Sequence, residues 1–168
     1  GNSTPRYQYS FRVGADWKGF DLSLFFQGVG KCDMWGSSSL TLAGFNTGDG
    51  AIAKRFSTDY WREDRTDAFY PRAVNMGNGT NSFNMCYSDR YLLNMAYLRL
   101  KNIELGYSFK QEWIRKAKLE RLRIYVSAQN ILTITGIDDY DPEKYGTDTR
   151  GHAYPNAKTF SVGLNITL

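Results

Sequence analysis

Long runs of strictly alternating apolar and polar residues constrain this chain more than any other feature. The clearest run ends the chain, where Phe160, Val162 and Leu164 are each separated by one small or polar residue. A period of two places apolar side chains on one face of a β-strand and polar side chains on the other. Similar runs recur along the sequence, so we predict five strands, at about residues 7–15, 20–27, 91–109, 121–132 and 157–168.

The connections between these segments alternate in length. A short turn at 16–19 is followed by a loop at about 28–90, a charged connection at 110–120 and a second loop at about 133–155. Compact soluble domains rarely contain such long connections. A membrane barrel has short turns on one side and long loops on the other, and its tilted strands run about nine to eleven residues. The pattern therefore favours a transmembrane barrel with long extracellular loops.

Aromatic residues are concentrated near the ends of the predicted strands. In a barrel they would form the two aromatic girdles at the membrane interfaces. A soluble β-rich module that binds carbohydrate through exposed aromatic side chains is the alternative interpretation. The short-turn group is Trp17, Phe20, Tyr107, Phe109 and Trp113, and the long-loop group is Tyr7, Tyr9, Phe25, Phe26 and Phe160.

One predicted strand changes phase partway along. Within 91–109, Leu98 and Leu100 are out of step with the later apolar positions Ile103 and Leu105. A β-bulge adds one residue to a strand, which reverses the faces of the residues beyond it. We therefore predict a bulge near the middle of this strand.

The five strands are predicted to be the C-terminal, antiparallel part of a large all-β barrel. Bacterial barrels have at least about eight strands. An open strand edge in lipid leaves backbone groups unpaired, at a cost of several kcal/mol each. We therefore expect the earlier strands to precede residue 1 in the same polypeptide. With the long loops outside, the terminus at Leu168 is expected to face the periplasm.

The sequence gives little support for catalysis or nucleic-acid binding. The net charge is +4, but the Lys and Arg residues are scattered and form no basic stripe. The single histidine, His152, lies in a loop, and no Ser or Cys has a base nearby in sequence. The acidic residues Asp138, Asp139, Asp141 and Glu143 do not have EF-hand spacing, so a solvated loop is preferred over a calcium site. We predict no enzyme activity, cofactor, metal or nucleic-acid partner.

A few side chains are candidates for contacts. Tyr60 and Trp61 lie in a segment that mixes aromatic and charged residues, which either stacks on sugars or contacts a partner, or simply pairs its own charges. Asp141 is a candidate contact in the second external loop. Another group is predicted to face the barrel interior, where packing against a plug is favoured over substrate binding. Its members are Arg121, Arg123 and Gln129, on one face of the strand at 121–132.

The two cysteines, Cys32 and Cys86, both fall in the first long loop. Their spacing matches no zinc or redox motif. They form a disulfide in an oxidising compartment or remain two partly buried free thiols, and the sequence leaves both alternatives open.

Several segments also resemble one protein family, in the order in which that family carries them. They are 60–61 (YW), 68–72 (AFYPR), 88–93 (SDRYLL), 97–107 (YLRLKNIELGY), 122–130 (LRIYVSAQN), 141–143 (DPE), 154–155 (YP) and 159–168 (TFSVGLNITL). The family they resemble is the SusC/RagA group of TonB-dependent outer-membrane transporters of Bacteroidetes. One difference is that family members usually end in an aromatic residue, whereas this chain ends in Leu168.

This resemblance implies a barrel of about 22 strands, with an N-terminal plug and the earlier strands outside this chain. It implies a location in the lipid of the cell outer membrane, with a SusD-like surface lipoprotein as partner. The TonB-ExbB-ExbD complex would act through the missing N-terminal part. The implied substrates are oligosaccharides or peptides. A passive porin, which has no plug, is the other membrane-protein interpretation.

Overall fold

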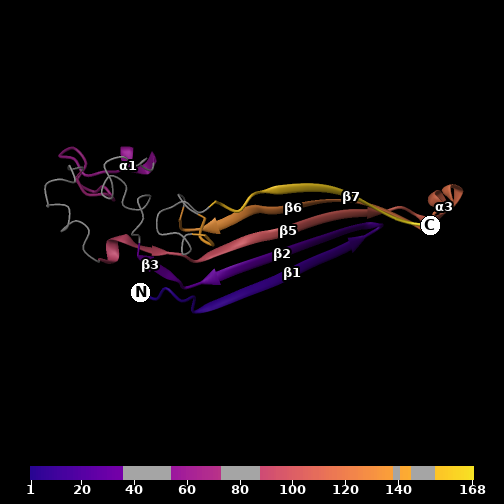
Figure 1. The fold of residues 1–168 in the computed structure, drawn as a ribbon, viewed down its shortest axis with the longest axis horizontal. Helices are drawn as coiled ribbons and strands as arrows, with labels where there is room; N and C mark the ends of the chain where they lie inside the picture. The colour runs from indigo at the N-terminus through magenta and orange to yellow at the C-terminus, as the bar shows by residue number, and fades with distance from the viewer. Residues whose placement is uncertain (36–53, 73–87, 138–140, 145–153) are drawn as a thin grey trace. The chain divides into compact units, whose positions relative to one another are not determined.

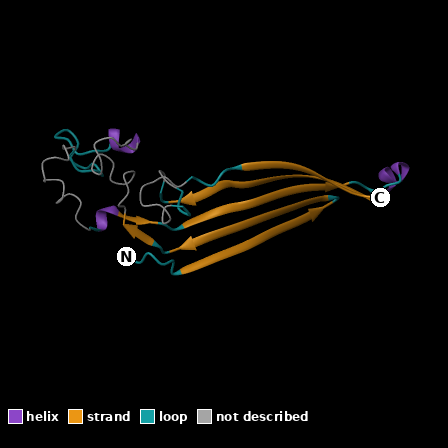
Figure 2. Ribbon diagram, in the orientation of Figure 1, coloured by secondary structure: helices purple, strands orange, loops and turns teal. Residues whose placement is uncertain are grey.

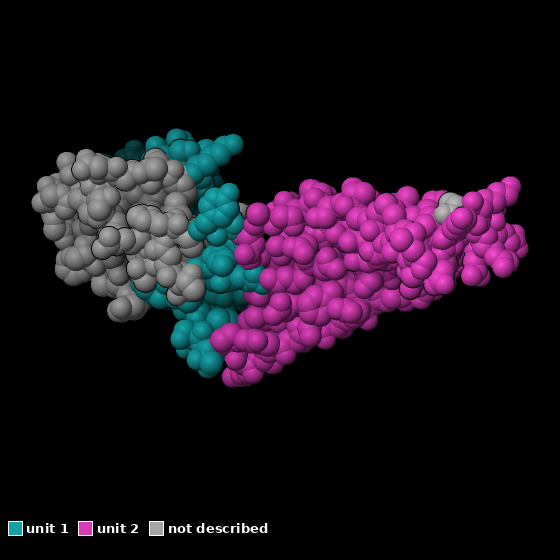
Figure 3. All heavy atoms as spheres, turned by 45° about the vertical axis from the view of Figure 1, so that its right-hand side comes forward, with its two compact units in different colours: residues 1–4, 32–95, 137–155 teal, residues 5–31, 96–136, 156–168 magenta. Residues whose placement is uncertain are grey.

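The computed structural model describes residues 1–35, 54–72, 88–137, 141–144 and 154–168. The chain divides into two compact units, which are coloured separately in Figure 3. We call residues 5–31, 96–136 and 156–168 the sheet unit, and residues 1–4, 32–95 and 137–155 the loop unit. Each unit is described by itself.

The sheet unit is a meander of five antiparallel strands in which every strand pairs with its neighbour in chain order (Figures 1 and 2). All five predicted strands are present, and three of them run a few residues beyond their predicted ends. The strands are β1 Tyr7–Trp17, β2 Phe20–Gly30, β5 Tyr97–Ser108, β6 Arg121–Thr135 and β7 Thr159–Thr167.

One face of this sheet is apolar from edge to edge. Directly paired residues lie on the same face, and one such row joins five apolar side chains across all five strands: Val13, Leu24, Ile103, Ala128 and Phe160. The face is also uncovered, since Phe160 is 76% exposed. Large exposed apolar patches of this kind mark surfaces that meet another protein or a membrane.

The opposite face is polar. A representative row joins Gly14, Ser23, Glu104, Ser127 and Ser161 across the five strands. The chief exception is Phe25, whose ring lies 5.6 Å from the guanidinium carbon of its cross-strand neighbour Arg12. This cation–π contact places a positive charge over the one large aromatic ring that breaks the alternation of β2.

The predicted β-bulge is confirmed, and it lies at Lys101. On the β2 side, Phe25 pairs with Asn102 and Phe26 pairs with Leu100, so Lys101 has no direct partner. The register against β6 also shifts between Leu100 and Asn102. There, Asn130 and Ile131 lie between the partners of these two residues, so β6 carries the additional residue on this side.

The bulge keeps the apolar face continuous. Without the extra residue, the period of two would turn Leu98 and Leu100 to the polar side. With it, Leu100 lies in a row with Phe26 of β2 and Leu132 of β6.

Aromatic side chains gather at both ends of the sheet unit, as predicted, but the prediction is wrong for Phe25 and Phe26. These two lie in the middle of β2, where they pair with Arg12 and Phe11. Where β1 turns into β2, Trp17 pairs with Phe20, whose ring centre lies 4.7 Å from that of Tyr107. At the opposite end, Tyr7 and Tyr9 pair with Gly30 and Gly28, and a Cβ atom at either glycine would collide with the tyrosine ring. Also at the turn end, the ring centre of Tyr107 on β5 lies 5.0 Å from that of Phe109, two residues further along the chain.

Two of the connections between neighbouring strands lie at the same end of the sheet (Figure 1). β1 and β2 are joined by Lys18 and Gly19, whose φ angles of 48° and 93° match a tight hairpin turn with two left-handed residues. β5 and β6 are joined through α3 Gln111–Ile114 and a 3₁₀ turn, Arg115–Ala117, within the charged connection at 110–120. No helix among the described residues is long and apolar enough to cross a membrane.

The predicted strand at 91–109 is wrong in its first part. Residues Asp89–Tyr91 form a 3₁₀ turn, β4 Leu92–Asn94 pairs with β3 Asp33–Trp35 in a separate two-stranded sheet, and β5 begins only at Tyr97. The apolar run of β4 looked continuous with β5 in the sequence. Its partner β3 lies nearly 60 residues away and has no alternation of its own long enough to reveal the pairing.

The loop unit has a small aromatic core. Phe56, Tyr70 and Tyr91 are buried, and Trp35, Tyr60 and Phe69 pack around them. Phe56 comes from α1 Lys54–Thr58, which lies inside the predicted loop at 28–90. The described part of that loop is therefore folded on itself rather than a plain connection.

We predict that deleting Lys101 prevents assembly of the parent barrel, whereas Lys101→Ala assembles normally. Deletion removes the bulge and sends one half of β5 to the wrong face, while the alanine substitution keeps the residue count. Assembly is measured by the heat-dependent shift in electrophoretic mobility of the full-length protein. Normal assembly of the deletion variant would contradict the assigned register.

Candidate functional site

A charge cluster on the polar face of the sheet unit joins three strands. Nε of Arg123, on β6, donates to Oδ1 of Asp21 on β2 at 3.0 Å, and a second guanidinium nitrogen contacts the other oxygen of Asp21. That nitrogen also donates to Oε1 of Glu104 on β5 at 2.7 Å. When a guanidinium binds one carboxylate through two nitrogens, the interaction is strong and its orientation is fixed.

Gly106 gives Arg123 the room to reach across β5. The direct cross-strand neighbour of Arg123 is Ser108, so its side chain must lean along β5 to meet Asp21. A Cβ atom at Gly106 would lie 2.6 Å from Nε of Arg123 and 2.6 Å from Oδ1 of Asp21. The ring of Tyr125 adds a contact from β6 itself, 5.0 Å from the guanidinium carbon.

The cluster holds strands together rather than performing chemistry. The Arg123 side chain is only 13% exposed, while Asp21 and Glu104 are 30% and 32% exposed. One guanidinium faces two carboxylates, so the cluster keeps a surplus negative charge on the polar face. No nucleophile or histidine base lies within this group of residues, so the geometry indicates an ion-paired brace between β2, β5 and β6.

The three residues that the sequence placed on one polar face do share it. Arg121 is exposed at the start of β6, and Oε1 of Gln129 accepts a hydrogen bond from the Thr159 hydroxyl at 3.3 Å. Sequence reasoning missed Asp21 and Glu104 as partners of Arg123. They lie 102 and 19 residues from it along the chain, and only the strand register brings them together.

In the loop unit, the segment that contains Tyr60 and Trp61 is a compact turn. The Trp61 amide donates to the Tyr70 carbonyl at 2.9 Å, and the Tyr70 amide donates to the Asp59 carbonyl at 3.0 Å. The carboxylate of Asp59 in turn accepts from Arg65 at 2.8 Å and pairs with Arg55 at 3.4 Å. Much of the charge in this segment is thus paired within the segment.

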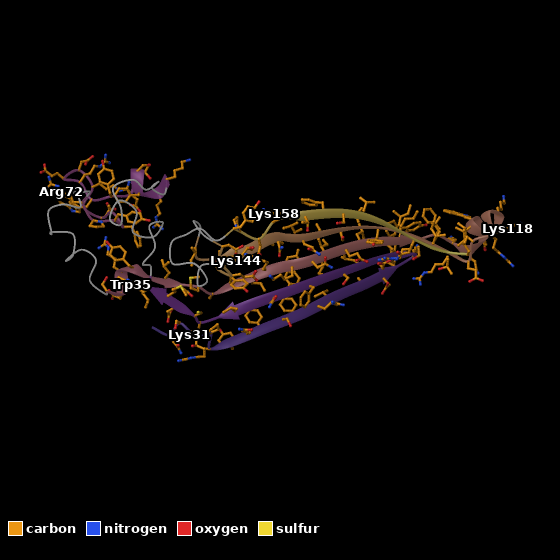
Figure 4. The ribbon with its side chains drawn as sticks, in the orientation of Figure 1. Lys31, Trp35, Arg72, Lys118, Lys144 and Lys158 are labelled. Carbon is orange, nitrogen blue, oxygen red and sulfur yellow. The ribbon has the colours of Figure 1, made fainter. Side chains whose placement is uncertain are left out.

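An open hollow of about 330 Å³ lies beside this turn, lined by Tyr60, Trp61, Arg62, Glu63 and Arg72. The guanidinium carbon of Arg62 lies 5.3 Å from the centre of the Tyr60 ring. Glu63 and Arg72, the latter labelled in Figure 4, form no ion pair with another described residue. Aromatic faces beside guanidinium and carboxylate groups suit a sugar ring or a peptide, because rings stack and charged groups hydrogen-bond.

Two of the segments that carry the family resemblance meet in the loop unit. Nε of Arg90 donates to the Phe69 carbonyl at 2.9 Å, and another guanidinium nitrogen donates to the Ala68 carbonyl. The ring of Tyr91 lies 5.5 Å from that of Phe69, and burial raises the pKa of the Tyr91 phenol. The segment 88–93 thus supports the backbone at Ala68 and Phe69, next to Tyr70, which pairs with Tyr60 beside the hollow.

Asp141 lies in a tight turn. Its Oδ1 accepts from the Glu143 amide at 3.1 Å, and its carbonyl accepts from the Lys144 amide at 3.0 Å. Asp138, Asp139 and His152 lie outside the described residues. No group of three or more metal-binding side chains occurs in the part of the chain that the structure describes.

Cys32 is a buried free thiol whose Sγ donates to the Ser3 carbonyl at 3.2 Å. Burial, and secondarily the nearby Asp33 carboxylate, raise the pKa of this thiol above its ordinary value. In the structure Cys32 is thus a thiol, as in the second of the two alternatives that the sequence leaves open, while Cys86 lies outside the described residues.

Known proteins match this chain in sequence and in fold, although no family model matches it. It is 30% identical over 178 residues to TonB-dependent receptor P3 of Formosa agariphila. This match covers 99% of the chain and 17% of that receptor. It is 40% identical over 81 residues to TonB-dependent receptor SusC of Bacteroides thetaiotaomicron. This second match covers 47% of the chain and 8% of SusC.

Solved structures of the RagAB peptide transporter have the same fold. One superposes with a TM-score of 0.71 at 25% identity, and one in the closed-closed state with 0.72 at 26% identity. Each match covers 98% of this chain and 17% of the solved chain. The chain is a barrel segment of the SusC/RagA family of TonB-dependent transporters. It spans 17% of the length of the P3 receptor and of each RagAB chain.

The family and the fold class predicted from the sequence are both confirmed by these matches. As part of a SusC/RagA barrel, the segment belongs to the outer membrane. The Arg123 brace and the hollow beside Trp61 are the two features of this barrel segment that go beyond its strand pattern.

We predict that Arg123→Met lowers the free energy of unfolding of the full-length barrel by about 2–3 kcal/mol, because it leaves two carboxylates without their cation. Arg121→Met is the matched control on the same face of β6. Arg121 acts on Asp21 through its charge, without forming an ion pair in the described structure, so this exposed substitution should change the free energy of unfolding by less than about 0.5 kcal/mol. Urea unfolding of the refolded protein in lipid vesicles measures both values. Equal effects of the two substitutions would contradict the assigned brace.

Proposed function

We propose that the parent protein imports oligosaccharides or peptides across the outer membrane, driven by TonB and assisted by a SusD-like surface lipoprotein. The observation that carries this proposal is the RagAB match, which extends over 98% of the chain. RagAB is described as a peptide transporter, and SusC as a TonB-dependent receptor. The relatives thus support nutrient import across the outer membrane, and of these two names the one that specifies a cargo is RagAB, a peptide transporter.

In this proposal the apolar face of the sheet unit contacts lipid and the polar face lines the barrel lumen. Apolar side chains such as Val162, 78% exposed here, then meet acyl chains instead of water. The Arg123 brace lies inside, and Arg121 and Gln129 pack against a plug supplied by the rest of the protein. The strand direction then puts Leu168 at the periplasmic side and both long loops outside.

The hollow in the loop unit is the proposed external contact for substrate or for the lipoprotein. Tyr60 and Trp61 supply ring faces, and Arg72 supplies a guanidinium that has no ion pair with another described residue. Asp141 is a second proposed contact, from the turn described above. The aromatic and charged groups together suit either a short glycan or a peptide, which is the range of cargo that we propose.

Uptake by the native bacterium tests this function. We predict that cells lacking the gene lose accumulation of labelled oligosaccharides or peptides from its growth medium, and that a plasmid copy restores it. A protonophore should abolish the restored uptake, because TonB draws on the inner-membrane proton gradient. Uptake that persists with protonophore would instead indicate a passive porin and would overturn the proposal.

A variant pair in the same assay tests the hollow. Trp61→Ala should raise the substrate concentration for half-maximal uptake roughly three- to tenfold, since a ring contact contributes about 0.5–1.5 kcal/mol beyond its area. Trp113→Ala, at the turn between β5 and β6, is the control for loss of an exposed tryptophan and should leave that concentration unchanged. Equal behaviour of the two variants would remove the hollow from the proposed function without affecting the import proposal.

A further inference from the structure

The connection between β5 and β6 is strongly basic, and its charged side chains are exposed. It carries Lys110, Arg115, Lys116 and Lys118, opposed within the connection only by Glu112 and Glu120. None of the four cations forms an ion pair with another described residue. Figure 4 shows Lys118 at the end of the sheet unit that is remote from Lys31 and Lys158. The connection therefore presents unneutralised positive charge at one end of the barrel wall.

Exposed aromatic rings accompany this charge. Trp113 is 60% exposed on α3, and Trp17 is 68% exposed on the neighbouring hairpin of the same unit. The ammonium of Lys18 lies 5.0 Å from the centre of the Trp17 ring. Tryptophan beside lysine or arginine is the combination that anchors proteins at the headgroup level of a bilayer.

The connection is ordered, so its cations are held in place. Ile114 is buried at 5% exposure and fixes α3 against the sheet unit. The amides of Trp113 and Lys118 donate to the carbonyls of Lys110 and Arg115, each at 3.0 Å. The Leu119 amide donates back to Ile114 at 3.3 Å. The basic side chains thus point from a fixed turn and do not belong to a free tail.

We propose that this basic turn, defined as Lys110, Trp113, Arg115, Lys116 and Lys118, binds the headgroups of anionic phospholipids in the adjacent leaflet. Charge complementarity favours a phosphate-bearing partner, because the connection carries four cations against the two carboxylates of Glu112 and Glu120, and none of the four forms an ion pair with a described residue. The apolar face that adjoins the turn favours lipid over an acidic protein as the partner. The turn joins the ends of two strands whose apolar face carries Leu105 and Ile124, each more than 40% exposed.

The inference depends on the barrel but not on the cargo that the barrel imports. A guanidinium group can donate two hydrogen bonds to two oxygens of one phosphate. A lysine ammonium group adds positive charge and depends less on the orientation of the phosphate. Each basic residue near an anionic surface strengthens binding several-fold, so removing three of them should weaken it by about tenfold or more. Acyl chains of the same lipid would lie along the apolar face, so lipid binding should exceed that of the headgroup phosphate alone.

Lipid binding is tested with the full-length transporter, delipidated in an uncharged detergent. Native mass spectrometry measures the affinities for phosphatidylglycerol and phosphatidylcholine. The test variant is Arg115→Gln with Lys116→Gln and Lys118→Gln. The control variant removes the same charge at the other end of the sheet unit, beside β1, β2 and β7, through Arg6→Gln, Lys31→Gln and Lys158→Gln. Heat-dependent electrophoretic mobility confirms that each variant is folded, and a double variant, Lys116→Gln with Lys118→Gln, serves if the triple variant does not fold.

We expect the wild type and the control variant to prefer phosphatidylglycerol over phosphatidylcholine by about tenfold, and the test variant to lose that preference. Equal binding of the two lipids by the wild type would overturn the proposal. So would equal losses in the test and control variants, or an undiminished preference in the test variant. Full displacement of the lipid by millimolar inorganic phosphate would also overturn it, because the site would then recognise free phosphate.

Discussion

The uncovered apolar face of the five-stranded sheet is the constraint on which the rest of the structure depends. At about 25 cal/mol per Å² of apolar surface, leaving such a face in water would be a large penalty for so small a sheet. Val126, Phe160 and Leu164 all lie on it and all are highly exposed. The outer strands β1 and β7 each also have one edge without a partner strand among the described residues. Lipid on the face and further strands at the edges, as in the RagAB barrel, resolve both difficulties together.

Several local features follow from keeping that face apolar. The bulge at Lys101 corrects the phase of β5, so that Leu100 stays on the same side as Ile103. The charges of the sheet are turned to the other face, where Arg123 braces three strands. At the turn end, aromatic and basic side chains occupy the level where apolar and polar surroundings meet. A soluble carbohydrate-binding module would need a second layer over the apolar face, and none exists among the described residues.

Alternation predicted the five strands, their antiparallel order and even the bulge, because a period of two is a local property that any single strand displays. It failed where structure depends on distant partners. β4 was merged with β5 because its partner β3 is remote, and the brace partners Asp21 and Glu104 are visible only once the register is known. The aromatic core around Tyr70 was missed for the same reason. The roles of Tyr60, Trp61 and Asp141 are proposals, and the pairing of Cys32 with Cys86 falls partly outside the described residues.

The most direct measurement is the solvent accessibility of single spin labels on the two faces of β6 and β7 in the full-length protein reconstituted into lipid vesicles. Labels at Val126 and Leu164 report on the apolar face, and labels at Ser127 and Asn165 report on the polar face one residue away. Our account predicts that Val126 and Leu164 collide readily with oxygen, which concentrates in lipid, and hardly at all with a water-soluble nickel chelate. Free access of the nickel chelate to those two positions would contradict it.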